Sequence, residues 1–154
     1  MTGDEDRWSP RAEALLFAAA RADHVGKFIR PALERGAWVL CDRFIDSTRA
    51  YQGGASGISD TDVLSLHAIG SDGLMPDRTL VLELPVIEGQ SRTAKRDGNF
   101  KDRMGARDSE YYQKVTSSFR MFADDDPSRF RRVIATGSEE EVTAQLLAAL
   151  DGLL

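Results

Sequence analysis

The chain has 154 residues, of which 42% are hydrophobic and 29% are charged, and its formal net charge is −5. This length suits one domain over residues 1–154, and the negative charge argues against a protein that coats a nucleic-acid polymer. The sequence has no run of about 18 apolar residues, so we expect no membrane span and a cytoplasmic protein.

The first predicted element is a helix that begins after Ser9. Ser9 is a favourable N-cap residue, and Pro10 suits the first helical position. Pro31 should bend or divide the continuation of this helix, and Gly36 should end it. We expect the helix to turn four side chains toward the core: Ala14, Leu15, Ala18 and Ala22.

The stretch at residues 37–41 is the first predicted strand. Its sequence Ala-Trp-Val-Leu-Cys is apolar throughout, as expected of a strand buried on both faces of a parallel sheet. Cys41 is the single cysteine of the chain, and its apolar neighbours favour a buried structural thiol over a reactive one.

A string rich in ligand-binding side chains follows at residues 42–53. It reads Asp-Arg-Phe-Ile-Asp-Ser-Thr-Arg-Ala-Tyr-Gln-Gly. A charged pair just past a buried strand projects into the crevice where open α/β sheets bind ligands. Arg43 offers a fork of donors suited to phosphate, and Asp42 can hold a hydrated cation. The hydroxyl pair, the aromatic ring and the amide that follow suit the edge and face of a base.

Helix and strand signals alternate through the rest of the chain. Ser59 with Asp62 predicts a helix start, and Ser138 with Glu141 predicts a capping box for the last helix. The helix after Ser59 should run to about residue 70. Between the two capped helices we expect a strand at 79–84, a long helix over about 108–123 and a strand around 133–135.

Alternation of this kind implies an α/β protein with a parallel sheet covered on both faces, although three strands are few for such a sheet. An ATP-dependent enzyme of this class should contain G-x-x-x-x-G-K-[S/T], whose backbone amides cradle phosphates. The sequence has no such string. The glycine-rich stretch 53–57 has no lysine, and we interpret it as a turn.

From Ser9 onward the chain resembles the bacterial thymidylate kinases, which transfer the γ-phosphoryl group of ATP to dTMP for dTDP and dTTP synthesis. The resemblance implies a P-loop nucleoside-monophosphate-kinase-like parallel sheet that is incomplete here. Its central first strand and phosphate loop are missing, and we therefore expect an N-terminally truncated and inactive chain. The resemblance rests on four stretches: residues 9–21, 42–53, 76–80 and 102–103.

The resemblance implies a dTMP site made by seven residues. Phe17 would stack on thymine, and Arg21, one helical turn later, would bond its carbonyl edge. Tyr51 would occupy the place of a ribose 2′-hydroxyl and so favour deoxyribose. Core packing is the alternative role of Phe17. The seven residues are Phe17, Arg21, Arg43, Ser47, Thr48, Tyr51 and Gln52.

Arg43 would grip the phosphate of dTMP. Asp42 would hold Mg²⁺, directly or through water, or else would position Arg43. Thr48 would contact the pyrimidine edge and Gln52 would bond the base, whereas Ser47 has helix capping as its alternative role. Asp42 and Arg43 thereby belong to the implied catalytic set.

The resemblance also implies a lid over about residues 92–104, which contains five cations. Charge on the transferring phosphoryl oxygens needs cations held close. Arg96 is the expected catalytic arginine and Arg103 a second candidate, while Arg92 and Arg96 would contact ATP. A solvated face is the alternative for a run of charge. The five cations are Arg92, Lys95, Arg96, Lys101 and Arg103.

Three interpretations compete. The first is a thymidylate kinase that binds dTMP and ATP and forms a homodimer, as the family does. The second is another nucleoside-monophosphate or deoxynucleoside kinase, against which Phe17, Arg21 and the string at 51–53 argue. The third is a non-catalytic remnant or interaction protein that keeps the dimer-forming helices.

Overall fold

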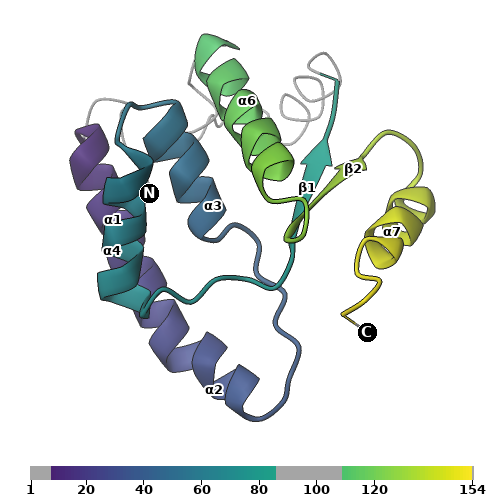
Figure 1. Cartoon of the computed structure of the whole chain (residues 1–154), viewed down its shortest axis with the longest axis horizontal. Coiled ribbons are helices and arrows are strands. Elements are labelled where there is room, and N and C mark those ends of the chain that lie inside the picture. Colours follow the sequence, from purple (N-terminus) through teal and green to yellow (C-terminus); the bar gives the residue numbers. More distant parts are fainter. Residues whose placement is uncertain (1–7, 86–108, 154) are drawn as a thin grey trace, which may run out of the picture. The chain divides into compact units, whose positions relative to one another are not determined.

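A computed structural model describes residues 8–85 and 109–153 (Figure 1). The chain divides into two compact units. We call Asp4–Met75 with Asp108–Ser118 the helical unit, and Met1–Gly3, Pro76–Arg107 and Phe119–Leu154 the strand unit.

Helix α1 (Pro10–His24) opens the described part of the helical unit. The hydroxyl of Ser9 accepts a hydrogen bond from the amide of Ala12 at 3.3 Å, which confirms the predicted cap. Ala14 and Ala18 are buried as predicted, but Leu15 is 55% exposed, so its assignment to the core is wrong. The buried stripe follows the helical repeat from Ala14, and Leu15 lies about 100° away around the axis.

A π-helical segment, η2 (Val25–Ile29), joins α1 to helix α2 (Arg30–Glu34). Pro31 has no amide to donate to a helical carbonyl, and the backbone widens just before it, where the Arg30 amide donates to the carbonyl of Val25. Gly36, with φ of +74°, ends α2. Its amide and that of the next residue donate to the carbonyls of Leu33 and Ala32, at 2.8 and 3.0 Å, the bonds of a Schellman motif.

Residues 37–41 are not the predicted buried strand. They have no regular secondary structure, and the side chains of Trp38 and Leu40 are 64% and 96% exposed. Cys41 is half-buried rather than buried. A strand is stabilised by ladder hydrogen bonds to a neighbour, and the sheet of the described residues contains only two other strands, which pair with each other.

The motif string forms a short helix, α3 (Ile45–Thr48), that continues into a π-helical segment, η3 (Arg49–Gly54). Helix α4 (Asp60–Ser71) follows, with its predicted cap confirmed by a 3.1 Å bond from the Asp62 amide to the Ser59 hydroxyl. Helices α1 and α4 pack side by side (Figure 1). Gly70 allows this, since a Cβ atom added there would lie 3.3 Å from the Cβ atom of Ala22.

Helix α6 (Ser109–Asp125) contributes its first ten residues to the helical unit. Tyr111, Val115 and Ser118 are buried at i, i+4 and i+7 and so share one face. This face meets η3 closely, because a Cβ atom added at Gly54 would lie 3.1 Å from the Cβ atom of Ser118.

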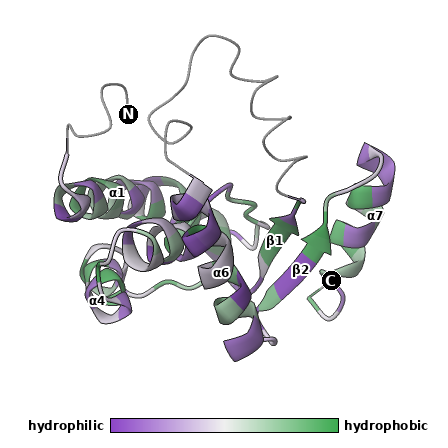
Figure 2. Ribbon diagram, turned by 90° about the horizontal axis from the view of Figure 1, so that it is seen from above, coloured by the Kyte–Doolittle hydropathy of each residue, from purple (hydrophilic) through white to green (hydrophobic). Residues whose placement is uncertain are grey.

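The strand unit contains two parallel strands, β1 (Thr79–Glu83) and β2 (Phe130–Ile134), in the register that pairs Thr79 with Phe130. Both were predicted, the second beginning earlier than expected, so the described sheet has two strands and not three. Figure 2 shows β2 as hydrophilic in its middle and hydrophobic toward its end. Phe122 of α6 packs on Phe130 with ring centroids 6.2 Å apart.

The last helix, α7 (Glu139–Ala148), carries the predicted capping box between Ser138 and Glu141.

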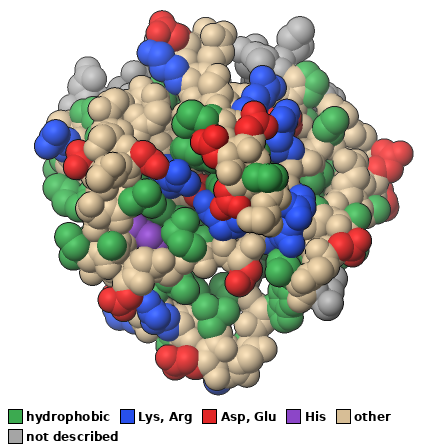
Figure 3. All heavy atoms as spheres, in the orientation of Figure 1, with side chains coloured by type: hydrophobic (Ala, Val, Ile, Leu, Met, Phe, Trp, Pro, Cys, Tyr) green, Lys and Arg blue, Asp and Glu red, His purple; other side chains and the backbone are tan. Residues whose placement is uncertain are grey.

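Parallel strands with helices confirm the predicted α/β class. On the face shown in Figure 3, acidic and basic side chains are interspersed with hydrophobic ones. No helix in the described ranges 8–85 and 109–153 is long and apolar enough to cross a membrane.

Candidate functional site

The pair Asp42-Arg43 lies at the surface directly before α3, and both residues are exposed. Arg43 has φ of +60°, in the left-handed region that few residues other than glycine adopt. Residues held in such conformations cluster at functional sites, where the surrounding structure offsets the strain. The backbone strain therefore supports a functional role for Arg43.

The guanidinium group of Arg43 lies over an aromatic ring of the same unit. Its central carbon is 4.9 Å from the ring centroid of Tyr51 in η3, a cation–π geometry. The Tyr51 ring in turn makes an edge contact with Tyr111 of α6, with centroids 6.2 Å apart. The cation is thus oriented by a side chain that is itself packed.

A second arginine is buried on α1. The guanidinium of Arg21 donates to the hydroxyl of Thr48, and its central carbon lies 5.8 Å from the ring centroid of Phe44. Desolvation lowers the pKa of Arg21, and the nearby Cys41 and Asp46 oppose this shift. The structure thus brings together two of the residues expected to contact the edge of the base.

The other residues expected near the base, Phe17, Ser47 and Gln52, differ from one another in how deeply they are buried. Phe17 is half-buried on α1, one turn before Arg21, and Ser47 is half-buried on α3. Gln52 is 2% exposed, and its amide nitrogen donates to the carboxylate of Glu13, also 2% exposed, at 3.4 Å. The Gln52 amide nitrogen therefore has a partner inside the unit.

Two further residues, Arg49 and His67, support the site. Arg49 donates to Asp60 through two nitrogens at 2.8 Å and to Asp46 at 3.1 Å, which ties η3 to the start of α4. The hydrogen bond to Asp60 is the main cause of a raised pKa of Arg49. His67 of α4 packs edge-on against Phe44 with ring centroids 5.5 Å apart, and its Nε2 atom lies 2.7 Å from the carbonyl oxygen of Leu74.

Sequence reasoning did not find three of the supporting residues, and it assigned no role to a fourth. Glu13 lies one turn before Phe17 on the same helix, a spacing that could have suggested it. No sequence signal indicated His67 or Tyr111, because packing between distant segments creates their contacts. Phe44 lies inside the string at residues 42–53, but the sequence assigned it no role.

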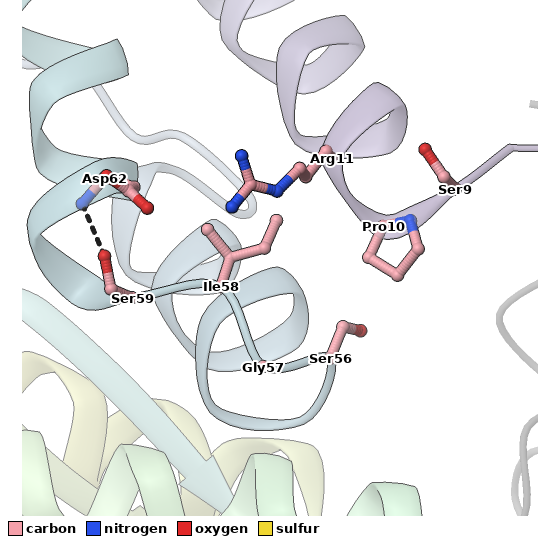
Figure 4. A pocket seen from close by; sticks show the side chains of 8 residues that line it. All are labelled: Ser9, Pro10, Arg11, Ser56, Gly57, Ile58, Ser59 and Asp62. Atoms are coloured by element: carbon pink, nitrogen blue, oxygen red, sulfur yellow. Dashed lines mark hydrogen bonds between the residues drawn. The ribbon is translucent and has the colours of Figure 1, made fainter.

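A cavity of about 440 Å³ opens between the start of α1 and the start of α4. Figure 4 shows the Arg11 side chain reaching between Ile58 and Asp62 at its wall. None of the seven expected dTMP ligands lines this cavity, but the Ser56 hydroxyl of its lining donates a hydrogen bond to the carbonyl of Tyr51 at 2.9 Å. Its lining comprises Ser9, Pro10, Arg11, Ser56, Gly57, Ile58, Ser59 and Asp62.

Asp42 is a single exposed carboxylate, and the part of the chain that the structure describes has no group of three or more His, Cys, Asp or Glu residues placed to hold a metal. Magnesium is commonly held by one or two carboxylates together with substrate phosphates, so Asp42 fits that use. The expected lid lies outside the described residues, and with it Arg92, Lys95, Arg96, Lys101 and Arg103.

Comparison with known proteins identifies relatives along the whole chain. The model of the family described as thymidylate kinase matches residues 1–146. A thymidylate kinase of Rhizorhabdus wittichii is 53% identical over 154 residues, which are 100% of this chain and 74% of the relative. A thymidylate kinase of Chromohalobacter salexigens is 45% identical over 139 residues, which are 90% of this chain and 65% of the relative.

A solved structure agrees with these relatives. The crystal structure of thymidylate kinase from Ehrlichia chaffeensis matches with a TM-score of 0.72 and 26% identity, over 94% of this chain and 68% of that one. The agreement of the sequence and structure comparisons confirms the resemblance and the fold class. The chain belongs to the thymidylate kinase family, a family of phosphotransferases that use ATP as the phosphate donor.

Proposed function

We propose that this chain supplies the dTMP-binding part of a thymidylate kinase, which transfers the γ-phosphoryl group of ATP to dTMP and yields dTDP. One observation carries the proposal. Arg43, the expected phosphate ligand, is followed directly by Phe44, whose ring lies under the guanidinium of Arg21, the expected base ligand. Two consecutive residues would thus contribute to both parts of the nucleotide site: Arg43 at the phosphate, and Phe44, through Arg21, at the base.

At the phosphate end, the Arg43 guanidinium offers parallel donors to two phosphate oxygens. Its stacking on Tyr51 limits the directions in which it can point. Asp42, next to it, would hold Mg²⁺ through water, and the ion would neutralise charge on the phosphates of ATP and dTMP. Fixing the acceptor phosphate in one orientation is the main contribution a protein makes to this kind of transfer.

At the base end, Arg21 and Thr48 would meet the carbonyl and amide edge of thymine, and Phe17 would stack on its face. The bond between Arg21 and Thr48 fixes the guanidinium before a ligand arrives. Gln52 is buried, and it would either accept a hydrogen bond from the base through its carbonyl oxygen or pack behind the residues that contact the base. Tyr51 would fill the space that a 2′-hydroxyl needs, which favours deoxyribose.

The donor side of the reaction depends on other residues. Arg96 and Arg103 would stabilise charge on the transferring group, and Arg92 would lie against adenine. The 154-residue sequence contains no phosphate-loop motif, so we propose that these residues alone bind dTMP without phosphorylating it. We further propose a cytoplasmic homodimer, as we expect from the family.

The test is a phosphorylation assay with ATP, Mg²⁺ and a panel of dTMP, dUMP, UMP and dAMP, with products separated by chromatography. The 154-residue chain should give no dTDP above a mock preparation. The same chain joined to any in-frame upstream sequence that codes G-x-x-x-x-G-K-[S/T] should give dTDP, with dTMP as the preferred acceptor.

Two outcomes would contradict the proposal. Formation of dTDP by the 154 residues alone would show that they contain an unrecognised phosphate site. Preference for another acceptor in the extended protein would favour a different nucleoside-monophosphate kinase. Dimer formation is tested separately, by sedimentation of the purified chain.

A further inference from the structure

Tyr51 is held by two hydroxyl groups that converge on its main chain. Its carbonyl oxygen accepts a hydrogen bond from the Ser56 hydroxyl at 2.9 Å and another from the Tyr111 hydroxyl at 3.1 Å. Ser56 lies just past the end of η3, whereas Tyr111 is 60 residues away in the sequence, on α6. Two segments thus fix the same carbonyl group.

The Tyr111 side chain is placed firmly enough to act as a support. It is 8% exposed, and its ring makes edge contacts with Tyr51 and with Tyr112, at centroid distances of 6.2 and 5.8 Å. Val115 and Ser118 continue the same buried face, and the close approach of Gly54 to Ser118 leaves little freedom between α6 and η3. Because the Tyr111 ring is buried and packed, it has little rotamer freedom. Its hydroxyl therefore stays in one place relative to the carbonyl oxygen of Tyr51.

The chain of contacts ends at Arg43. The guanidinium of Arg43 stacks on the Tyr51 ring at 4.9 Å, and its own backbone is held in the left-handed region. An exposed arginine without such support would sample many rotamers, and ordering it on a phosphate would cost conformational entropy. Stacking on Tyr51 already restricts the Arg43 side chain before phosphate binds, so less conformational entropy is lost on binding. This holds only if Tyr51 itself is fixed in position.

We propose that Tyr111 is a positioning residue for the phosphate end of the nucleotide site, acting through Tyr51 on Arg43. This inference rests on the proposed function, because it takes Arg43 as the ligand of a nucleoside 5′-monophosphate. Tyr111 touches no substrate in this account.

The test measures dissociation constants of dTMP and of thymidine by calorimetry for the wild-type chain and for Tyr111→Phe. Thymidine lacks the phosphate, so the ratio of the two constants isolates the contribution of Arg43. Tyr111→Phe removes only the hydroxyl and should reduce this ratio by about threefold to tenfold, the value of one hydrogen bond. Thymidine affinity should stay near the wild-type value.

Two further variants sharpen the test. Ser56→Ala removes the other donor to the same carbonyl and should reduce the ratio in the same direction. The double variant should lose more than the sum of the two single effects in free energy, since one remaining hydroxyl still holds the carbonyl in each single variant. Tyr112→Phe, which removes the hydroxyl of the next residue, is the matched control and should leave the ratio unchanged.

The outcomes separate this inference from the proposed function. A wild-type chain that binds thymidine as tightly as dTMP would contradict the phosphate role of Arg43 itself. A normal wild-type ratio that Tyr111→Phe leaves unchanged would overturn only the positioning role. Equal losses of dTMP and thymidine affinity would assign Tyr111 a structural role and would also overturn the inference.

Discussion

The guanidinium group of Arg21 on α1 donates a hydrogen bond to the hydroxyl of Thr48 on α3, 27 residues further along the chain. Both side chains are buried, so water cannot replace the bond if it is lost. A hydrogen bond to a charged group contributes about 1.5–3 kcal/mol, and a buried donor left without a partner costs a similar amount. The pair therefore serves both the stability of the helical unit and the proposed base site.

The first prediction concerns this bond. Thr48→Val keeps the shape of the side chain but removes the acceptor, and it should lower the free energy of unfolding by about 1–3 kcal/mol. It should also weaken dTMP binding, whereas Thr48→Ser should retain most of both. Urea denaturation and calorimetry provide the measurements, with Thr61→Val at an exposed position of α4 as the control. A Thr48→Val chain as stable as the wild type would show that Arg21 has an adequate alternative partner.

The second prediction concerns sugar specificity. Tyr51→Ala should reduce the preference for dTMP over its ribonucleotide counterpart, 5-methyl-UMP, because the space for a 2′-hydroxyl opens. Affinity for dTMP itself should also fall, since Arg43 loses the ring on which it stacks. The ratio of the two dissociation constants is therefore the informative quantity. Tyr51→Phe should keep the wild-type ratio, and an unchanged ratio in Tyr51→Ala would remove Tyr51 from the specificity site.

The third prediction concerns the contact between η3 and α6. Gly54→Ala should destabilise the chain by about 1–3 kcal/mol, because the added methyl group would overlap the Ser118 side chain. The loss should be smaller in a Ser118→Ala background. Gly26→Ala is the matched control: a Cβ atom there meets nothing within 4 Å, so it should stabilise the chain by about 0.5–1 kcal/mol. Equal effects at the two glycines would contradict the close contact.

The fourth prediction concerns pH. Burial is the main cause that lowers the pKa of His67 below its ordinary value of 6.5. Between the lowered pKa and 6.5 the unfolded chain binds more protons than the folded chain, so the free energy of unfolding should fall as the pH drops below about 6.5. One such group contributes a slope of at most about 1.4 kcal/mol per pH unit.

His67→Gln should flatten this part of the stability profile, because glutamine does not titrate and can still donate to the carbonyl of Leu74. Denaturation curves of both chains between about pH 5 and 7.5 give the comparison. Ala68→Gln, at an exposed position of α4, is the control and should keep the wild-type slope. A wild-type slope in His67→Gln would show that other groups cause the acid dependence.

Helix starts were predictable from the sequence, whereas residues 37–41 do not form the strand that was predicted there. Ser9, Ser59 and Ser138 cap their helices as predicted, because a cap needs only a hydroxyl and an amide three residues away. The apolar stretch 37–41 gave an equally clear local signal, but a strand forms only with a neighbour, and local composition does not supply one.

The same distinction between local and long-range contacts applies to the candidate site. Residues 42–53 revealed the chemistry of the site, since its side chains are consecutive in the sequence. The supports of that string come from elsewhere: His67 under Phe44, and Tyr111 on the carbonyl of Tyr51. These contacts depend on how helices pack, which the side chains of the string do not determine.

The role of Arg43 at the phosphate is the central claim, and the most direct test compares dTMP with thymidine on the wild-type chain and on Arg43→Ala. The wild type should bind dTMP more tightly than thymidine, and Arg43→Ala should remove about 2–3 kcal/mol of that difference, roughly a 30- to 150-fold change. Thymidine affinity should change little. An Arg43→Ala chain that keeps the full preference for dTMP would contradict the account.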